Sequence, residues 1–367
     1  MRARFALVFA LLLQLPVVAR AEWMSREEAI MGTRVYAELW DDDAAHGAKA
    51  LDAVMEFMRH VNALMSHYLP DSELSLINAR AGVEAVPVAP ELFDVIQKSV
   101  HYSEVTDGAF DITYASVGYL YDYRRHVHPT DQEIKAALPA VDYRSLILDP
   151  SARSVRFGKP GMRIDLGGIA KGWAADRSIE MLRDRFGITN AIVTAGGDSR
   201  ILGDRRGKPW VVAIRDPFDR SHVVTRIPLA DVGVSTSGDY EHYFDEGGVR
   251  YHHILDPKTG KSPTEVRSVT IIGPTATDTE GFSKGVFIKG PVEGLKLIER
   301  NPGLDAVVID KNGAVTYSKG LEPPPARASE IELGEYDGVE GRVAVERLGA
   351  GRYAHHGRIA KVAVAIE

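Results

Sequence analysis

The sequence contains no cysteine among its 367 residues. A thiolate nucleophile, Cys-ligated zinc, an iron–sulfur cluster and a lipid-modified cysteine are therefore excluded. Basic runs are also missing, and 44 Lys and Arg against 51 Asp and Glu give a net charge of −7, so no nucleic-acid partner is expected. The chain is 45% hydrophobic and 26% charged, which is typical of a globular protein and excludes disorder, collagen and a disulfide scaffold.

The first 21 residues have the pattern of a cleaved secretory signal. Arg2 and Arg4 precede an apolar run at 5–18, and Ala19-Arg20-Ala21 places small residues at the positions that signal peptidase reads. The apolar run is shorter than the roughly 20 residues of a membrane span, and Pro16 interrupts it, so an anchor is the weaker interpretation. We expect export to a bacterial periplasm, an oxidising compartment that a chain without cysteine tolerates.

The rest of the chain alternates helical and strand-like patterns. Apolar residues at helical spacing predict helices over 44–69, 90–106 and 169–186. Short β-branched segments bounded by turn formers predict strands at 34–39, 145–148, 154–157, 191–194, 210–214, 249–255, 267–273 and 306–309. We expect an α/β fold in which a mixed sheet carries flanking helices as one compact unit over 22–320, followed by a C-terminal extension, 321–367, without an assigned role.

The segment from Asp165 to Asp176 is the densest candidate site. Gly167 and Gly168 open a predicted helix, where free backbone amides can bind an anion and glycine allows close approach. Lys171, one turn further on, could neutralise a pyrophosphate as a point charge. The spacing matches neither a Walker A nor a Rossmann motif, so the segment alone is also compatible with an ordinary strand-to-helix turn.

Four further segments have a similar character, although each could also be a simple turn. Adjacent His252 and His253 lie on a predicted strand and point to opposite faces, so at most one of them serves a given site. Neither a G-x-S-x-G elbow nor an H-E-x-x-H zinc helix occurs, so the usual hydrolase templates fit poorly. The four segments are 106–113, 195–198, 235–239 and 252–260.

Taken in this order, the segments resemble the ApbE family of FAD:protein FMN transferases. The resemblance begins at Met31-Gly32-Thr33, passes through 66–68 and 72–78, and ends near Lys319, so it covers most of the chain. It implies a T-fold-like architecture. It also implies an exported, Mg²⁺-dependent enzyme that splits the pyrophosphate of FAD, attaches FMN to a Thr or Ser hydroxyl of a target protein and releases AMP.

The resemblance assigns roles to single residues. His253 would be the base that takes the proton of the acceptor hydroxyl, with Lys171 as a second catalytic residue and His252 as a structural neighbour. An imidazole with its ordinary pKa near 6.5 could accept that proton at neutral pH. Aromatic rings could stack on FAD, and carboxylates could accept its hydrogen bonds. FAD would lie between 31–112 and 165–290, bound by Met31, Tyr68, Ala109, Phe110, Asp111, Asp165, Lys171 and Ile254.

The predicted metal site departs from the family pattern. The family has an Asp and, four residues later, a Thr in a short helix, where this chain has Glu280 and Lys284. Mg²⁺ prefers octahedral oxygen ligands, and an ammonium group offers none. The remaining ligands would be the Gly168 carbonyl, Glu280 and the Ser283 hydroxyl. Asp278 is a second choice of carboxylate, at a spacing that fits less well.

Three functions remain open. The first is FMN transfer to an exported or membrane-bound acceptor, with a displaced metal or with Lys284 supplying positive charge at the pyrophosphate. The second is FAD binding or FAD hydrolysis without transfer, in which Glu280 and Lys284 pair at their i, i+4 spacing. The third is a structural or binding protein of an envelope complex without flavin, which the aromatic and acidic residues argue against. We favour transfer, because His253 and Lys171 match the family.

Overall fold

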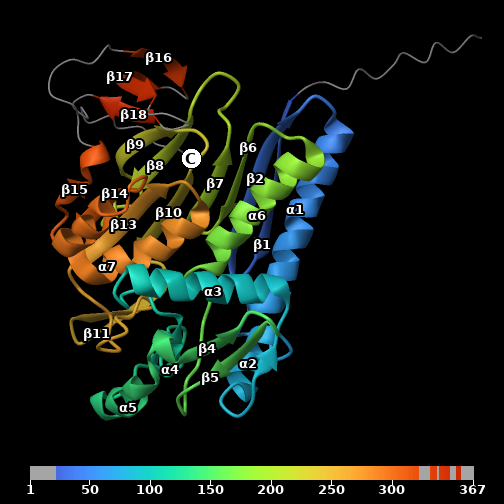
Figure 1. Cartoon of the computed structure of the whole chain (residues 1–367). Helices are drawn as coiled ribbons and strands as arrows, with labels where there is room; N and C mark the ends of the chain where they lie inside the picture. The colour runs from blue at the N-terminus through green and yellow to red at the C-terminus, as the bar shows by residue number, and fades with distance from the viewer. Residues whose placement is uncertain (1–21, 322–330, 337–338, 348–352, 357–367) are drawn as a thin grey trace, which may run out of the picture.

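The sheet at the centre of the molecule is antiparallel throughout. Among the described residues, its eight strands lie in the order β1-β2-β6-β7-β10-β13-β14-β15 (Figure 1). They are β1 (Glu22–Ile30), β2 (Thr33–Asp41), β6 (Ala191–Ala195), β7 (Asp198–Leu202), β10 (Gly233–Gly238), β13 (Val266–Gly273), β14 (Asp305–Asp310) and β15 (Val315–Tyr317). The computed structural model describes residues 22–321, 331–336, 339–347 and 353–356, so the predicted signal at 1–21 lies outside them.

Two-residue connections produce the antiparallel pairing, where the sequence predicts a mixed sheet. Met31 and Gly32 join β1 to β2, and both have positive φ, of 56° and 69°. That geometry is typical of the tight turns that join antiparallel strands. Gly196 and Gly197 form a second two-residue connection, between β6 and β7. Both glycine-containing turns lie at one end of the sheet.

The sheet has a different cover on each face. Side chains along β14 alternate: Ala306 and Val308 belong to the larger core, and Val307 and Ile309 to a smaller one, as alternate strand residues must. The larger core lies beneath helices α1, α6 and α7 (Figure 1). A hairpin covers the second face, and its strands are β8 (Trp210–Arg215) and β9 (Val223–Leu229).

The helices begin and end at the expected signals. Asp43 caps α1 by accepting hydrogen bonds from the amides of Ala45 and His46. Gly187 ends α6 in the left-handed conformation that favours glycine. Helix α3 crosses below the ends of α1 and α6 (Figure 1). The long helices are α1 (Ala44–Met65), α3 (Pro90–Val105), α6 (Ala170–Phe186) and α7 (Ala276–Glu299).

Helix α7 is the element that the sequence predicts least well. The expected short helix is wrong in length, since α7 runs for 24 residues with a break at Gly290, where φ is 80°. Its glycines pack it against α3: a Cβ at Gly281 would lie 2.6 Å from the Tyr102 ring, and one at Gly285 would lie 2.7 Å from Thr106. Residues that lower helix propensity therefore serve packing here.

The expected helices and most expected strands are confirmed, with shifts at their ends. Strand β5 (Ser154–Phe157) has its predicted bounds, whereas the helix predicted over 44–69 ends at Met65. The strand predicted over 249–255 is wrong beyond β12 (Val249–His252). Its ladder ends because the Ser262 hydroxyl binds both the amide and the carbonyl of His252, and a turn at Asp256 follows.

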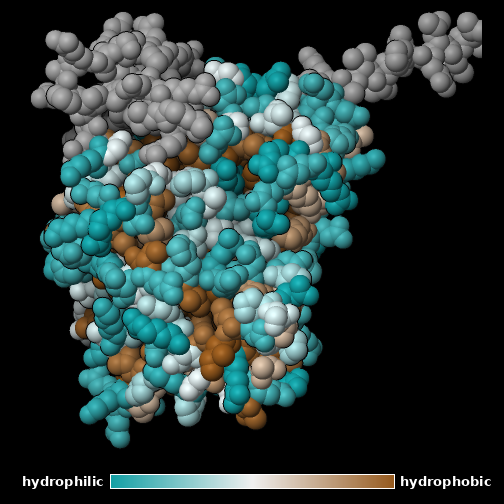
Figure 2. Space-filling model, in the orientation of Figure 1, coloured by the Kyte–Doolittle hydropathy of each residue, from teal (hydrophilic) through white to brown (hydrophobic). Residues whose placement is uncertain are grey.

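The remaining elements are short. They are α2 (Glu73–Arg80), β3 (Val86–Pro87), α4 (Ala115–Gly118), α5 (Asp131–Ala137), β4 (Leu146–Asp149), β11 (Tyr243–Glu246), β16 (Ile331–Tyr336), β17 (Val339–Arg347) and β18 (Tyr353–His356). The last three form a separate sheet within the predicted C-terminal extension. Figure 2 shows a largely hydrophilic face, with hydrophobic surface mainly in a strip below α3. No helix in the described ranges is both long and apolar enough to cross a membrane.

Candidate functional site

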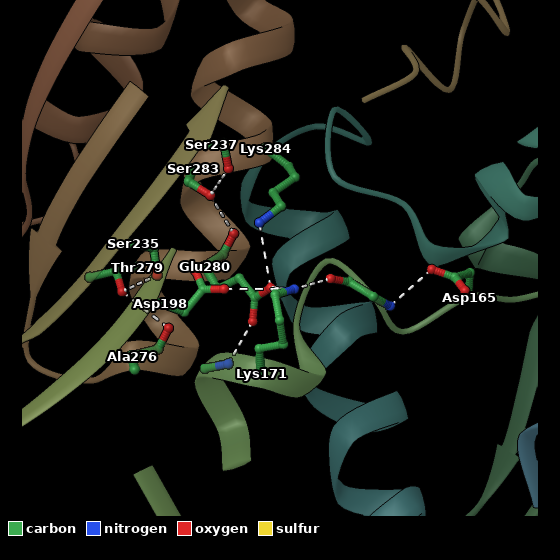
Figure 3. A network of polar contacts seen from close by, with 12 residues as sticks. Asp165, Lys171, Asp198, Ser235, Ser237, Ala276, Thr279, Glu280, Ser283 and Lys284 are labelled. Atoms are coloured by element: carbon green, nitrogen blue, oxygen red, sulfur yellow. Dashed lines mark hydrogen bonds and ion pairs between the residues drawn. The ribbon is translucent and has the colours of Figure 1, made fainter. Parts of the chain in front are cut away.

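Two lysines meet on one buried carboxylate where α6 and α7 pack together. Lys171 Nζ lies 2.8 Å from Glu280 Oε1, and Lys284 Nζ lies 3.5 Å from the same oxygen. The Gly172 amide donates to Glu280 Oε2 at 2.7 Å. Figure 3 shows both ammonium groups pointing at this carboxylate, which is fully buried. A buried charge needs partners of this kind to offset its desolvation.

The close packing of the two helices brings these groups together. A Cβ at Gly172 would lie only 2.3 Å from the Ala276 carbonyl oxygen, so only glycine fits at this point of α6. One turn later, Asp176 accepts hydrogen bonds from the amides of Ala276 and Thr277, both at 2.8 Å. The Asp176 carboxylate thereby caps α7 and holds the helix start against α6.

Asp198, at the start of β7, is the second acid of the cluster. Its Oδ2 lies 3.6 Å from Lys171 Nζ, and its Oδ1 is buried without a hydrogen-bond partner among the described residues. Burial, and next the charge of Glu280, raise the pKa of Asp198 to about 6, although Lys171 and Lys284 oppose this shift. Asp198 was not predicted as a site residue, although the segment 195–198 was singled out for its glycine pair.

The charges set the protonation of the ion pairs. Burial alone would raise the pKa of Glu280, but Lys171 and Lys284 bring it below its ordinary value. Burial alone would lower the pKa of Lys171, but Glu280 and Asp198 raise it above the usual range. Lys171 therefore stays cationic and Glu280 stays anionic at neutral pH.

Asp165 is the centre of a neighbouring cluster. Its Oδ2 lies 2.5 Å from His67 Nδ1, and its Oδ1 accepts from the Tyr114 hydroxyl at 3.0 Å and the Gly167 amide at 2.9 Å. Burial would raise the pKa of Asp165, but these partners, His67 first, lower it overall. The hydrogen bond to Asp165 in turn raises the pKa of His67. The Tyr68 ring packs on His67 with centroids 3.8 Å apart.

The two clusters are joined through the backbone of one residue, Gly167. Gly167 donates its amide to Asp165 and accepts from the Lys171 ammonium through its carbonyl (Figure 3). The sequence predicted Asp165, Lys171 and Tyr68 as site residues, and the structure brings them to one region. The sequence did not indicate His67 or Tyr114 as site residues, although His67 adjoins Tyr68 in a segment that carries the family resemblance.

His253 lies just beyond β12, and its ring edge meets His242 at a centroid distance of 5.3 Å. Its Nδ1 is buried and has no hydrogen-bond partner within the described part of the chain. Burial, and then the charges of His242, His252, Lys284 and Lys171, lower the pKa of His253 to about 3. The imidazole is therefore neutral at physiological pH, and the ordinary pKa near 6.5 expected for it is wrong in this structure, because burial disfavours the charged form.

The neighbouring His252 has a structural position. It is 1% exposed, its Nε2 lies 2.8 Å from the Pro263 carbonyl oxygen, and its ring meets Phe287 edge-on. Burial lowers the pKa of His252 as well. His252 fixes the loop through Nε2, which agrees with the structural role expected for it, while Nδ1 of each histidine is buried without a partner among the described residues.

Comparison with known proteins identifies the family. The model of the ApbE family matches residues 31–308. The chain belongs to the ApbE family. Its relatives include the FAD:protein FMN transferases of Treponema pallidum (strain Nichols), 32% identical over 83% of this chain and 89% of that protein, and of Haemophilus influenzae, 32% identical over 78% and 87%.

Solved structures agree with this assignment. The ApbE protein from Thermotoga maritima superposes with a TM-score of 0.75 at 34% identity, covering 81% of this chain and 97% of that one. The flavin transferase ApbE from Vibrio cholerae gives 0.73 at 29% identity, covering 81% and 96%. The predicted fold class, helices combined with a sheet in the ApbE architecture, is therefore confirmed.

The other residues that the ApbE resemblance assigns to FAD occupy varied positions. Phe110 is close to the lysine cluster, because a Cβ at Gly168 would lie 3.6 Å from both the Phe110 ring and Lys284 Cε. Asp111 is already bonded, accepting from the Thr113 amide at 2.8 Å and the Tyr143 amide at 3.0 Å. The Asp111 side chain therefore holds its own loop in this structure.

Three assigned residues show no polar link to the lysine cluster. Met31 is partly buried in the turn between β1 and β2, which approaches Lys171 through Gly196. Ala109 and Ile254 are buried, and Ile254 is part of the larger core. The structure does not test their contact with FAD, so these assignments stay predictions.

The predicted magnesium ligands do not fit a divalent cation in this arrangement. Both Glu280 oxygens face the ammonium and amide groups described above. The Ser283 hydroxyl donates to the Glu280 carbonyl at 2.8 Å, and Asp278 accepts from Tyr102 and Thr275 at 2.6 Å. No group of three His, Asp or Glu side chains in the described ranges is placed to hold a metal ion.

Proposed function

We propose that the protein is an FAD:protein FMN transferase that attaches FMN to a Thr or Ser hydroxyl of another protein and releases AMP. The proposal rests on membership of the ApbE family, whose relatives in Treponema pallidum and Haemophilus influenzae carry that name. The observation that carries it is the placement of Lys171 and Lys284 on Glu280, with both ammonium charges acting on a neutral His253.

These groups suit phosphoryl transfer. The acceptor hydroxyl oxygen forms a bond to the phosphorus of the FMN half, the bond from that phosphorus to the bridging oxygen breaks, and AMP leaves with the electron pair. His253 takes the hydroxyl proton. With a pKa of about 3 in the free protein its imidazole is a weak base, so the negative charge of the bound pyrophosphate has to raise that pKa during the reaction. Lys171 and Lys284 stabilise the negative charge on the phosphate oxygens, which is the main demand of such a reaction.

The acceptor and the compartment follow from the signal pattern. We infer that residues 1–21 direct export to a periplasm and that the acceptor is an exported or membrane-bound protein. The transferase unit then extends over 22–320, and the extension 321–367 has no role in this proposal.

FAD binding without transfer is the second candidate. The Lys284–Glu280 pair at 3.5 Å is the observation that favours it, because two charges that neutralise each other need no metal ion and no reaction at this position. Transfer, hydrolysis and FAD binding alone differ in their products: transfer yields AMP and a flavin-labelled acceptor, hydrolysis yields AMP and free FMN, and a carrier leaves FAD intact.

Product analysis separates these candidates. The protein is incubated with FAD and a Thr-containing acceptor peptide, or with the same peptide carrying Ala in place of Thr, and AMP, FMN and peptide mass are followed. We expect AMP and a flavin adduct on the Thr peptide alone. The variant His253→Ala should still bind FAD but form no adduct. Intact FAD, or free FMN with an unmodified Thr peptide, would contradict the proposed transfer.

A further inference from the structure

We propose that the ammonium group of Lys284 takes the place of the divalent cation that the ApbE resemblance predicts. The protein then binds the pyrophosphate of FAD through Lys284 and Lys171 and needs no metal ion. This inference rests on the proposed function, because it names the groups that receive the pyrophosphate, and it adds no co-reactant to the transfer step.

The position of Lys284 is the first argument. Two of the three predicted ligand positions lie beside it: its Nζ lies 3.5 Å from Glu280 Oε1, and its Cε lies 3.6 Å from where a Gly168 Cβ would be. Its side chain is 17% exposed. The ammonium group therefore lies among the groups that would otherwise be expected to hold the metal.

Charge is the second argument. A Mg²⁺ ion bound at about 2.1 Å from Glu280 Oε1 would lie within about 6 Å of both the Lys171 and the Lys284 nitrogens. The two ammonium charges would repel it in a partly buried site, where the repulsion is stronger than in water. The carboxylates of Glu280 and Asp198 already have these two ammonium groups as counter-charges.

The two departures from the family pattern, Glu280 in place of Asp and Lys284 in place of Thr, also match each other. A lysine at position 284 needs an acceptor one turn earlier on α7, and the carboxylate of Glu280 reaches both Lys284 and the Gly172 amide on α6. Aspartate is one methylene shorter than Glu280, so it could not reach as far from α7 toward α6. Glu280 and Lys284 therefore act as a linked pair that exchanges a metal site for a fixed positive charge.

Metal dependence tests this directly in the wild-type protein. FAD affinity is measured by flavin fluorescence in EDTA and in excess Mg²⁺, and Mn²⁺ binding is measured by isothermal titration without FAD. We expect the FAD affinity to agree within twofold in the two buffers, and no Mn²⁺ site. FAD binding that EDTA abolishes and Mg²⁺ restores, or one Mn²⁺ site per chain, would overturn the inference.

Variants that restore the family pair provide the reverse test. Lys284→Thr should weaken FAD binding at least tenfold in EDTA. The double variant Glu280→Asp/Lys284→Thr should gain one Mn²⁺ site and recover FAD binding in Mg²⁺. Lys296→Thr is the matched control, since Lys296 lies on the same helix, is 59% exposed and pairs with Glu293. Equal FAD affinity in Lys284→Thr and Lys296→Thr, with folding verified by circular dichroism, would contradict the inference.

The two proposals fail in different ways. Absence of FAD binding in every buffer would contradict the proposed function, and the Mn²⁺ titrations would then decide the metal question alone. FAD binding and transfer that depend on Mg²⁺ in the wild-type protein would leave the proposed function intact and would overturn the replacement of the metal by Lys284.

Discussion

A buried imidazole and a buried carboxylate dominate the site at the scale of single residues. His253 has its pKa lowered to about 3 by burial first and by neighbouring positive charges next. Glu280 stays ionised because Lys171 and Lys284 outweigh its burial. Burial and the neighbouring histidines contribute most to keeping His253 unprotonated, and the two lysines that are proposed to bind the pyrophosphate add to this effect.

The low pKa of His253 predicts how stability depends on pH. In the unfolded chain its pKa is near 6.5, so between pH 6.5 and 3 the unfolded chain binds more protons, and the free energy of unfolding falls as pH falls. Urea denaturation should therefore show a smaller loss between pH 6.5 and 4 in His253→Gln than in the wild type. Replacing the exposed His60 by Gln should leave the wild-type dependence unchanged. Parallel curves for wild type and His253→Gln would contradict the assignment.

The buried carboxylate predicts a large effect on stability. Glu280→Gln removes the carboxylate that Lys171 and Lys284 share and leaves Lys171 only Asp198, at 3.6 Å, so we expect the free energy of unfolding in urea to fall by about 3 kcal/mol. Glu293→Gln, on the exposed face of the same helix, should change it by less than about 0.5 kcal/mol. Equal losses in the two variants would show that the ion pairs of Glu280 do not stabilise the fold.

At the scale of elements, the contact between α6 and α7 places the site. Gly172→Ala puts a methyl group 2.3 Å from the Ala276 carbonyl oxygen, so the helices must separate. We expect a loss of about 2 kcal/mol in unfolding free energy and weaker FAD binding, because Lys171 and Glu280 move apart. Gly82→Ala, whose Cβ would meet nothing within 4 Å, is the control. Unchanged FAD affinity in a destabilised Gly172→Ala variant would show that the packing of α6 against α7 does not position the FAD site.

Elements with a regular apolar period could be predicted from the sequence, and those built on small or polar residues could not. Helices α3 and α6 match their predicted bounds within one residue, because their buried side chains recur at helical spacing. Helix α7 contains several Gly, Ser and Thr residues, which disfavour helix interiors, and strand β10 is rich in Gly and Ser, which disfavour strands. Close packing of backbones selects those residues, and it depends on partners far away in the sequence.

The candidate site likewise contains residues that the sequence indicated and pairings that it did not. The Gly-Gly segment indicated Lys171 through its residue types, whereas the choice of His253 over His252 came only from the resemblance to the ApbE family. The pairing of Lys171 with Glu280 joins residues 109 positions apart, and that of Asp165 with His67 joins the loop before α6 to the loop after α1, so neither pair has a local signal. The spacing of Glu280 and Lys284 on one helix was readable, and their predicted ion pair is confirmed at 3.5 Å.

At the scale of the whole molecule, the proposed export predicts the start of the mature chain. Expression with residues 1–21 in a bacterium should yield a periplasmic protein whose N-terminal residue is Glu22, as read by intact-mass measurement. The variant Ala21→Arg removes a small residue at the cleavage position and should retain the uncleaved form. A cytoplasmic protein that keeps Met1 would contradict the export proposal.

The central claim is that this chain transfers FMN from FAD with its own lysines in place of a metal ion. The most direct measurement is ³¹P NMR of FAD with excess protein in EDTA, before and after a Thr-containing acceptor peptide is added. We predict that the two pyrophosphate resonances shift on binding and are then replaced by those of AMP and of a phosphodiester on the peptide. Pyrophosphate resonances that stay those of free FAD in EDTA, both before and after the peptide is added, would contradict the account.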